Sequence, residues 1–284
     1  MSLPNVLNAT PLPGSVSVTG SLSISIVVYR LDEAELGLNL GTLRLACEQA
    51  ELTDVALTMI DNSEQGTQAK ALRALAERTG WPRTNVLSGH GNVGYGAGNN
   101  LAIRAATTPA YLVLNPDVAL DANALRCGLA TLALSGVALV GAVGRDADGK
   151  PGFLSKRMPG VWTFFLRGFA PAWLKRRFDA QLAHYEYRDL ATDCVSDVIL
   201  VSGAFMLCRT DALHAVGGFD EHYFLHFEDL DLSLRLARQG RVVSDPQVTL
   251  IHHGGNSASR GLAHLRVFVR SGLRFFNTHG WRLI

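Results

Sequence analysis

The 284-residue sequence has no excess of charge of either sign. It carries 26 Lys and Arg against 25 Asp and Glu, a net charge of +1, and 18% of its residues are charged. Nucleic-acid-binding domains usually show a strongly basic face, so the composition argues against a nucleic-acid partner. At 48% hydrophobic, the chain is long enough for one large domain or two small ones with a full core.

Paired cysteines, a long apolar run and a secretory signal are also missing. The four cysteines form no Cys-x-x-Cys pair, which suits a reducing compartment and gives no zinc signal. The uncharged run 127–144 contains Thr131, Ser135 and four glycines, whereas a membrane span needs about 20 predominantly apolar residues. The first positive residue is Arg30, so the charged start of a signal peptide is absent. We therefore predict a cytoplasmic protein.

Hydrophobic periodicity predicts alternating strands and helices over residues 22–145, after a flexible tail at 1–21 that is rich in Pro, Ser, Asn and Thr. Apolar strands are predicted at 23–29, 55–60, 85–87, 111–114 and 137–143, with helical patterns at 34–49, 67–79, up to about 106, and at 122–134. This alternation predicts an α/β fold with a parallel sheet, helices on both faces, and ligands at the carboxyl ends of the strands. Asp61, a glycine-rich loop at 89–100 and Asp117 all follow such strands.

The second half of the chain is less regular. Residues 152–195 are aromatic and basic, an apolar segment spans 198–208, and a short strand at 248–251 precedes His252. Helices are predicted at 230–239 and, as an amphipathic element, at 263–277.

The densest group of carboxylates, histidines and aromatics lies at 217–232. Glu228, Asp229 and Asp231 stand at or just before a predicted helix start, where an acidic cap contributes roughly 0.5–2 kcal/mol. A carboxylate held against the apolar run 223–227 could instead have a raised pKa and act as a general base. The spacing leaves capping and catalysis open.

The glycine-rich loop has three interpretations. Gly89 to Gly94 fits the dinucleotide pattern G-x-G-x-x-G, which would indicate a dinucleotide-dependent oxidoreductase. That fingerprint needs its third glycine inside the helix, whereas this helix is predicted to start several residues later. A purely structural loop is the second interpretation, and a nucleotide-contacting loop of another kind is the one we favour.

Two further strand ends carry candidate metal ligands. Asn115-Pro116-Asp117 can be a simple turn, or Asp117 can be an oxygen ligand for Mg²⁺ or Mn²⁺, which complete their shell with phosphate oxygens and water. His252 and His253 can be ordinary histidines, or His252 can ligate the metal beside a diphosphate, with His253 the weaker candidate.

Eight short segments follow one another between about residues 23 and 281, and their order resembles the family 2 glycosyltransferases of the GT-A fold, in particular bacterial O-antigen and polysaccharide rhamnosyltransferases. The segments are Ile26-Val-Val-Tyr29, Ile60-Asp-Asn-Ser63, Asn92-Val-Gly-Tyr-Gly-Ala-Gly-Asn-Asn100, Leu114-Asn-Pro-Asp117, Ser202-Gly-Ala-Phe-Met-Leu207, Gly217-Gly-Phe-Asp220, Phe227-Glu-Asp-Leu-Asp-Leu232 and His252-x-Gly-Gly-x-Ser257.

The resemblance implies a Rossmann-like GT-A sheet with C-terminal acceptor-side elements and helices. It divides the chain into a nucleotide-sugar-binding half at 22–145, an acceptor and catalytic half of the same domain at 146–258, and a C-terminal helix at 259–284. It makes Asp229 the catalytic base and assigns Mg²⁺ or Mn²⁺ to Asp117 and His252. The donor side would comprise Tyr29, Asp61, Asn92, Gly94, Asn100 and Asn115, and the acceptor side Asp220, Glu228 and Asp231.

The implied reaction is one in-line displacement that inverts the anomeric carbon, with dTDP-rhamnose as donor and a saccharide or lipid-linked saccharide as acceptor, in cell-surface polysaccharide synthesis. A UDP-hexose donor and a non-catalytic sugar-binding protein are the alternatives within this fold. Two positions depart from the family pattern: Arg30 replaces the usual Asn, and the metal-binding DxD element is reduced to Asn-Pro-Asp.

Basic residues lie beside aromatic and apolar ones in two places. Lys175, Arg176 and Arg177 are flanked by Trp173 and Phe178, and the last helix carries Arg266, Arg270 and Arg274 at spacing four. One interpretation is an ordinary solvated face. The other is peripheral contact with an anionic membrane, at the cytoplasmic face of the inner membrane, which would bring the enzyme to a lipid-linked acceptor.

Overall fold

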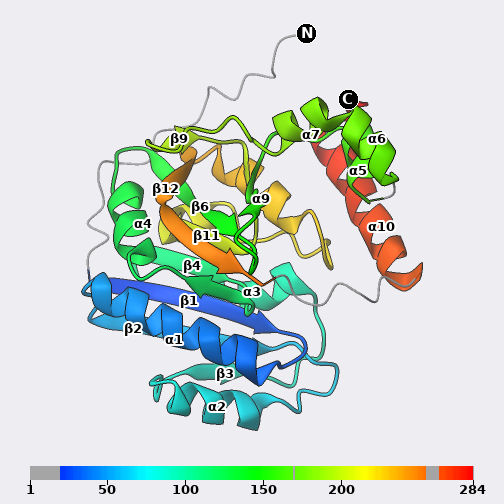
Figure 1. The fold of residues 1–284 in the computed structure, drawn as a ribbon. Coiled ribbons are helices and arrows are strands. Elements are labelled where there is room, and N and C mark those ends of the chain that lie inside the picture. Colours follow the sequence, from blue (N-terminus) through cyan, green and yellow to red (C-terminus); the bar gives the residue numbers. More distant parts are fainter. Residues whose placement is uncertain (1–19, 169, 254–261, 284) are drawn as a thin grey trace.

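The computed structural model describes residues 20–168, 170–253 and 262–283 (Figure 1). Most of the predicted tail lies outside the described residues, and Ser21 already begins the first strand. The helices of the described chain are α1 (Glu33–Gln49), α2 (Ala69–Arg78), α3 (Tyr95–Ile103), α4 (Ala124–Leu132), α5 (Val161–Gly168), α6 (Ala172–Arg177), α7 (Asp179–Tyr185), α8 (Thr210–Ala215), α9 (Glu228–Leu236) and α10 (Leu262–His279).

The described strands form a large mixed sheet and a separate two-stranded one. The main path of the large sheet is β3-β2-β1-β4-β11-β6-β12-β5, with β7 paired to β6 and β9 to β12, while β8 and β10 form the small sheet. The strands are β1 (Ser21–Val28), β2 (Asp54–Asp61), β3 (Asn85–Leu87), β4 (Ala110–Leu114), β5 (Val118–Leu120), β6 (Val137–Arg145), β7 (Pro151–Gly152), β8 (Ser155–Lys156), β9 (Ser196–Asp197), β10 (Leu200–Val201), β11 (Phe205–Arg209) and β12 (Arg241–His252).

Helices cover both faces of the sheet, as the sequence predicts, because successive strand residues point to opposite sides. In β4, Leu112 and Leu114 pack with α1, α2 and α4, whereas Tyr111 and Val113 pack with α3, α8 and α9. The two clusters are separate cores above and below one sheet.

The sheet is mostly parallel, which confirms the predicted GT-A fold class, although the strand–helix alternation by itself suggested a wholly parallel sheet. Strands β1 to β4 are parallel where they pair, but β11 enters between β4 and β6 and runs antiparallel to both. Strand β5 was not predicted; it follows β4 after a short turn and pairs antiparallel with β12. Periodicity identifies strands but carries no information on which strands pair.

A third layer of helices lies beside the sheet (Figure 1), where Phe164 of α5 packs against Phe268 and Phe276 of α10. On its buried side, Phe275 and Phe276 of α10 join Phe227 and Leu230 of the acidic segment in one apolar cluster. This cluster fixes the start of α9, which carries the candidate base. No helix among the described residues is long and apolar enough to cross a bilayer.

Candidate active site

A cavity of ≈ 540 Å³ lies between the residues around β7 and β8, helices α5 and α7, the start of α9 and the end of β12. Aromatic side chains form part of its wall, and the polar groups that line it come from elements far apart in the sequence. These polar groups belong to Lys156, Arg167, Tyr185, Glu186, Ser202, His226, Glu228, Asp229 and His252.

Asp229 is partly buried in the first turn of α9, and its carboxylate accepts hydrogen bonds from two backbone N–H groups. Its Oδ2 accepts the N–H of Gly203 at 2.8 Å and its Oδ1 accepts the N–H of Leu230 at 2.9 Å. The second bond stays within the first turn of α9 and is not a cap, since α9 has no side-chain cap hydrogen bond. The first bond leaves the helix and ties Asp229 to the loop between β10 and β11. Tyr95 at the start of α3 donates its hydroxyl to the carbonyl of the same Gly203 at 2.7 Å.

The two carboxyls at the start of α9 have different surroundings. Burial and the charge of Asp229 raise the pKa of Glu228 to about 8, and its Oε2 has no hydrogen-bond partner among the described residues. Burial also raises the pKa of Asp229, but the two backbone bonds and the charge of Lys156 act in the opposite direction. Of the two, Asp229 is therefore the carboxyl with hydrogen-bond donors that stabilise its ionised form.

The candidate metal ligands meet because β5 pairs with β12. The register places His252 opposite Val118, and Oδ2 of Asp117 lies 3.3 Å from Nε2 of His252. The N–H of His253 donates to the carbonyl oxygen of Asp117 at 3.0 Å. Within the described residues, no group of three or more His, Cys, Asp or Glu gathers as a metal site. A carboxylate and an imidazole fit an ion that takes its other ligands from a diphosphate and water.

The glycine-rich loop is held against the acidic segment through Gly94. Asn92 Oδ1 accepts from Asn62 Nδ2 at 3.0 Å and from the N–H of Gly94 at 3.1 Å. Gly94 has φ +89°, and a Cβ there would stand 2.3 Å from the carbonyl oxygen of Phe224. The N–H of Tyr95 donates to that oxygen at 3.1 Å. The loop therefore needs glycine both for its dihedral angle and for space.

The side chains of Asp61 and Asn100 form hydrogen bonds with other residues inside the protein. Asp61 is fully buried; burial opposes its ionisation, but hydrogen bonds from Ser63 and Gln68 outweigh this and lower its pKa. Gln68 Nε2 also donates to the carbonyl of exposed Tyr29 at 3.2 Å, so Asp61 orders the segment around Tyr29. The Asn100 amide binds both the N–H and the carbonyl of Phe219. In this structure Asn100 serves packing, while nucleoside contacts of Tyr29 and Asp61 stay predictions.

Asn115 follows β4, where its N–H donates to the carbonyl of Ala204 and its own carbonyl accepts from Asn39. Its half-buried side chain lies next to the Asp117 turn, and a contact with the donor stays a prediction.

Two carboxylates predicted on the acceptor side lie in ion pairs away from the cavity. Asp220 accepts two hydrogen bonds from Arg274, the shorter at 2.7 Å. Buried Asp231 pairs with Arg235 at 2.7 Å and with His279 at 2.8 Å. Neither lines the cavity, and both fasten α10 to the acidic segment. Their assignment to the acceptor side stays a prediction. The acidic segment contains both carboxylates that line the cavity and carboxylates in ion pairs. Their spacing in the sequence does not distinguish these two groups.

Lys156 is one of several cavity residues that the sequence did not single out, along with Arg167, Tyr185 and Glu186. It belongs to the two-residue strand β8, whose partner is Leu200 of β10, and it is 9% exposed. Burial, followed by the positive charge of Arg167, lowers its pKa to about 7. The short strand leaves no periodic signal, so only the fold reveals that this lysine is buried beside Asp229.

The backbone just before Glu228 is unusual. His226 and Phe227 both have φ +69°, a region that non-glycine residues rarely adopt, at a cost of roughly 1–3 kcal/mol each. Packing of Phe227 against Phe164, Phe268 and Phe275 holds this conformation in place. The bend directs Glu228 and Asp229 to the cavity wall.

The mixed sheet with helices on both faces has the arrangement of the GT-A glycosyltransferases. A family model described as "Glycosyltransferase like family 2" matches residues 24–263. The chain belongs to this family, which confirms the predicted resemblance and favours glycosyl transfer over the oxidoreductase alternative.

Two curated relatives come from bacteria. The N-acetylglucosaminyl-diphospho-decaprenol L-rhamnosyltransferase of Mycobacterium tuberculosis is 30% identical over 254 residues, 82% of this chain and 76% of the relative. The O-antigen biosynthesis protein RfbC of Myxococcus xanthus is 40% identical over 70 residues, 24% of this chain and 5% of the relative.

Two solved glycosyltransferases share the fold. The mannosyltransferase PcManGT from Pyrobaculum calidifontis, in complex with GDP-Man and Mn²⁺, has a TM-score of 0.59 at 15% identity and covers 94% of this chain. GalNAc-T7 with UDP, GalNAc and Mn²⁺ has a TM-score of 0.57 at 13% identity and covers 82% of it. This chain spans 65% and 43% of those two chains, and at such identities the likeness shows the fold alone.

Proposed function

We propose that this protein is an inverting rhamnosyltransferase that transfers L-rhamnose from dTDP-rhamnose to a lipid-linked saccharide in cell-surface polysaccharide synthesis. The observation that carries the chemistry is Asp229, which lines the cavity and accepts the N–H of Gly203, whereas Oε2 of neighbouring Glu228 has no hydrogen-bond partner among the described residues. The choice of sugar and acceptor rests on the name of the mycobacterial relative.

In the proposed reaction, an acceptor hydroxyl attacks the anomeric carbon of the donor and gives its proton to Asp229. The new C–O bond forms as the bond between that carbon and the nucleoside diphosphate breaks, so the anomeric configuration inverts. The apolar wall around the base limits water, and Gly203 keeps the carboxylate oriented. Lys156 adds a positive charge near Asp229 that favours the ionised base.

Asp117 and His252 would hold the divalent ion, Mg²⁺ or Mn²⁺, and the ion would neutralise negative charge on the departing diphosphate. Because the described chain offers two side-chain ligands, we expect a weak site that the donor completes. The same site could take a UDP-hexose as donor. The alternative that is not an enzyme is a protein that binds the nucleotide sugar without turnover.

Replacement of the base separates turnover from binding. We expect Asp229→Asn to lower kcat roughly 10²–10⁴-fold while donor binding, measured by thermal shift, persists. Glu228→Gln keeps the shape of a protonated carboxyl and should retain most of the activity. Near-normal turnover in a folded, donor-binding Asp229→Asn protein would refute the assignment, and a selective loss in Glu228→Gln would move the base to Glu228.

Donor identity and metal use can be read from the melting temperature, because a ligand that binds only the native state stabilises it by mass action. We expect dTDP-rhamnose to raise the Tm more than UDP-hexoses do, and more with Mn²⁺ or Mg²⁺ than with EDTA. Asp117→Asn should remove the metal-dependent part. A preference for a UDP-hexose would select the alternative donor, and stabilisation by NADH alone would contradict glycosyl transfer.

A further inference from the structure

Exposed apolar side chains gather on one part of the molecule. Of the fourteen large hydrophobic residues that are exposed in the described chain, six lie on α6, α10 and the segment that follows α10. That segment is anchored to α5, since the N–H groups of Val161 and Trp162 donate to the carbonyls of Arg282 and Leu283. The six are Trp173, Leu265, Val269, Leu273, Trp281 and Leu283.

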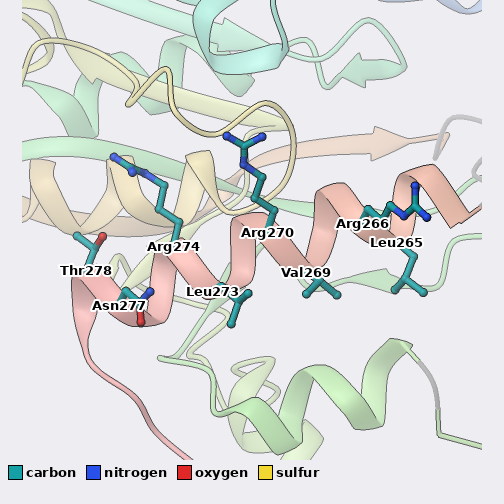
Figure 2. A pocket seen from close by; sticks show the side chains of 8 residues that line it. All are labelled: Leu265, Arg266, Val269, Arg270, Leu273, Arg274, Asn277 and Thr278. Atoms are coloured by element: carbon teal, nitrogen blue, oxygen red, sulfur yellow. The ribbon is translucent and has the colours of Figure 1, made fainter.

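Helix α10 separates its side chains by type. Leu265, Val269 and Leu273 project to one side at spacing four, while Arg270 and Arg274 project to the other (Figure 2). These residues border a shallow hollow of ≈ 590 Å³. The opposite, core-facing side of the helix carries buried Phe275 and Phe276. An apolar stripe flanked by arginines on a surface helix is the pattern of an interfacial amphipathic helix.

The chain segments that carry this stripe and its neighbours contain charges of one sign only. The segments 161–178 and 262–284 hold eight of the 26 Lys and Arg of the protein and none of its 25 Asp and Glu, although the net charge of the chain is +1. Arg274 is engaged by Asp220 and Arg167 lies near Glu186, so these two serve the fold. Arg266 and Arg270 are exposed beside the apolar stripe, and Arg176 and Arg177 are exposed on α6.

We propose that α6, α10 and residues 280–283 form a face that docks on an anionic phospholipid bilayer. The apolar stripe would enter the headgroup and acyl boundary while the arginines contact lipid phosphates. The purpose of this docking rests on the lipid-linked acceptor in the proposed function, but the face itself is defined by the side chains and charges alone.

The docking face and the catalytic cavity both include residues of α10, and α5 lines the cavity beside it. Phe164 of α5 and Phe268 of α10 line the cavity, whereas Leu265 and Val269 of α10 belong to the exposed face. Only the thickness of a helix, about 10 Å, separates the two surfaces. A saccharide on a lipid embedded at the docking face would thus need to extend only a short way to meet Asp229.

Vesicle flotation with the full chain tests the docking face. We expect wild type to float with phosphatidylcholine vesicles that contain phosphatidylglycerol and to stay unbound with phosphatidylcholine alone. Arg266→Gln with Arg270→Gln should weaken binding roughly 30-fold, since each basic residue near such a surface contributes about 5-fold. Leu265→Ser with Leu273→Ser should also release the protein. Equal recovery with both vesicle types would overturn the proposal.

Matched controls carry the same changes elsewhere. Lys70→Gln with Arg83→Gln removes two exposed cations around α2, and Leu38→Ser with Leu45→Ser removes two exposed leucines of α1. Both should float like wild type, and loss of binding in either would contradict a localised face. A wild-type dimer that the Leu265→Ser, Leu273→Ser variant dissociates would assign the stripe to a second copy of the chain and overturn the lipid proposal.

Failure of docking and failure of the proposed function give different results. Docking variants should keep wild-type turnover on a water-soluble acceptor analogue and lose it only on acceptor embedded in vesicles. Loss on both acceptors would mean that the stripe supports the fold or the site and would refute a docking role. Wild-type flotation without any turnover would instead leave the face intact and contradict the assigned reaction.

Discussion

Lys156 and Asp229 line the same cavity, and each shifts the proton affinity of the other. The positive charge of Lys156 favours ionised Asp229, and the negative charge of Asp229 favours protonated Lys156. Burial lowers the pKa of Lys156 to about 7, so its charge changes within the physiological range. The other titratable groups that line this cavity are Arg167, Tyr185, Glu186, His226, Glu228 and His252.

We therefore expect Lys156→Met to shift the acidic limb of the kcat/KM profile to higher pH. Without the nearby cation the pKa of Asp229 rises, so a higher pH is needed to ionise the base. Lys156→Arg should restore the wild-type limb, because it returns the charge. The measurement is a pH–rate profile with saturating metal; an unshifted limb in a folded Lys156→Met protein would show that Lys156 does not act through Asp229.

At the residue scale, the sequence identified groups by type and spacing but not their environment. Asp117 and His252 were predicted to lie together because each follows a strand. In the structure, Oδ2 of Asp117 lies 3.3 Å from Nε2 of His252. Asp220 and Asp231 share the acidic segment with Asp229, yet ion pairs with α10 engage them. Those pairs involve residues some 50 positions away, and a local pattern contains no information about them.

Among the elements, the glycine-rich loop couples the donor side to the acidic segment. Gly94 permits the loop to lie on the backbone of Phe224, and Tyr95 extends the connection to Gly203, which holds Asp229. A movement of this loop would therefore reach the base through two hydrogen bonds. Donor binding and the orientation of Asp229 should be linked.

Gly89 supplies a matched control for Gly94. Both have φ +89°, but a Cβ at Gly89 would have nothing within 4 Å, whereas one at Gly94 would collide with Phe224. Gly89→Ala should lower stability only through its dihedral angle, by about 1 kcal/mol. Gly94→Ala should cost more and reduce kcat as well, as chemical denaturation and kinetics would show. Equal effects of the two substitutions would refute the role of the Phe224 contact.

Strong periodicity explains which elements were predictable. The long helices α1 and α10 and the apolar strands β1, β2, β4 and β6 lie within a few residues of their predicted positions. Most short elements, such as β5, β8 and α6, were not predicted, because two to six residues rarely show a period, and the three-residue β3 is an exception. Lys156 belongs to one of these short elements.

For the whole molecule, the sheet joins the two predicted halves of the chain. Strand β11, from the second half, lies between β4 and β6 of the first half and pairs with both. Helix α10 then fastens the acidic segment through Asp220 and Asp231. The halves at 22–145 and 146–258 therefore complete one sheet together.

A fragment that ends after β6 should not fold independently. Residues 1–146 retain β1 to β6 but lack the strand that joins β4 to β6, so both strands would expose open edges. We expect this fragment to lack a cooperative unfolding transition and to aggregate, measured by calorimetry and light scattering. Addition of the second half as a separate chain should restore solubility. A soluble fragment with its own sharp transition would contradict the interlocked sheet.

Because β11 lies late in the sequence, it is synthesised well after the two strands that it joins, β4 and β6. A ribosome that has just released β6 must add roughly 60 more residues before β11 emerges, which takes about 3–12 s at ordinary elongation rates. During that interval the backbone N–H and C=O groups along one edge of β4 and of β6 have no partner strand, so another extended chain can pair with them. The nascent protein therefore depends on chaperones at this stage, and faster translation of codons 146–209 would shorten the exposure.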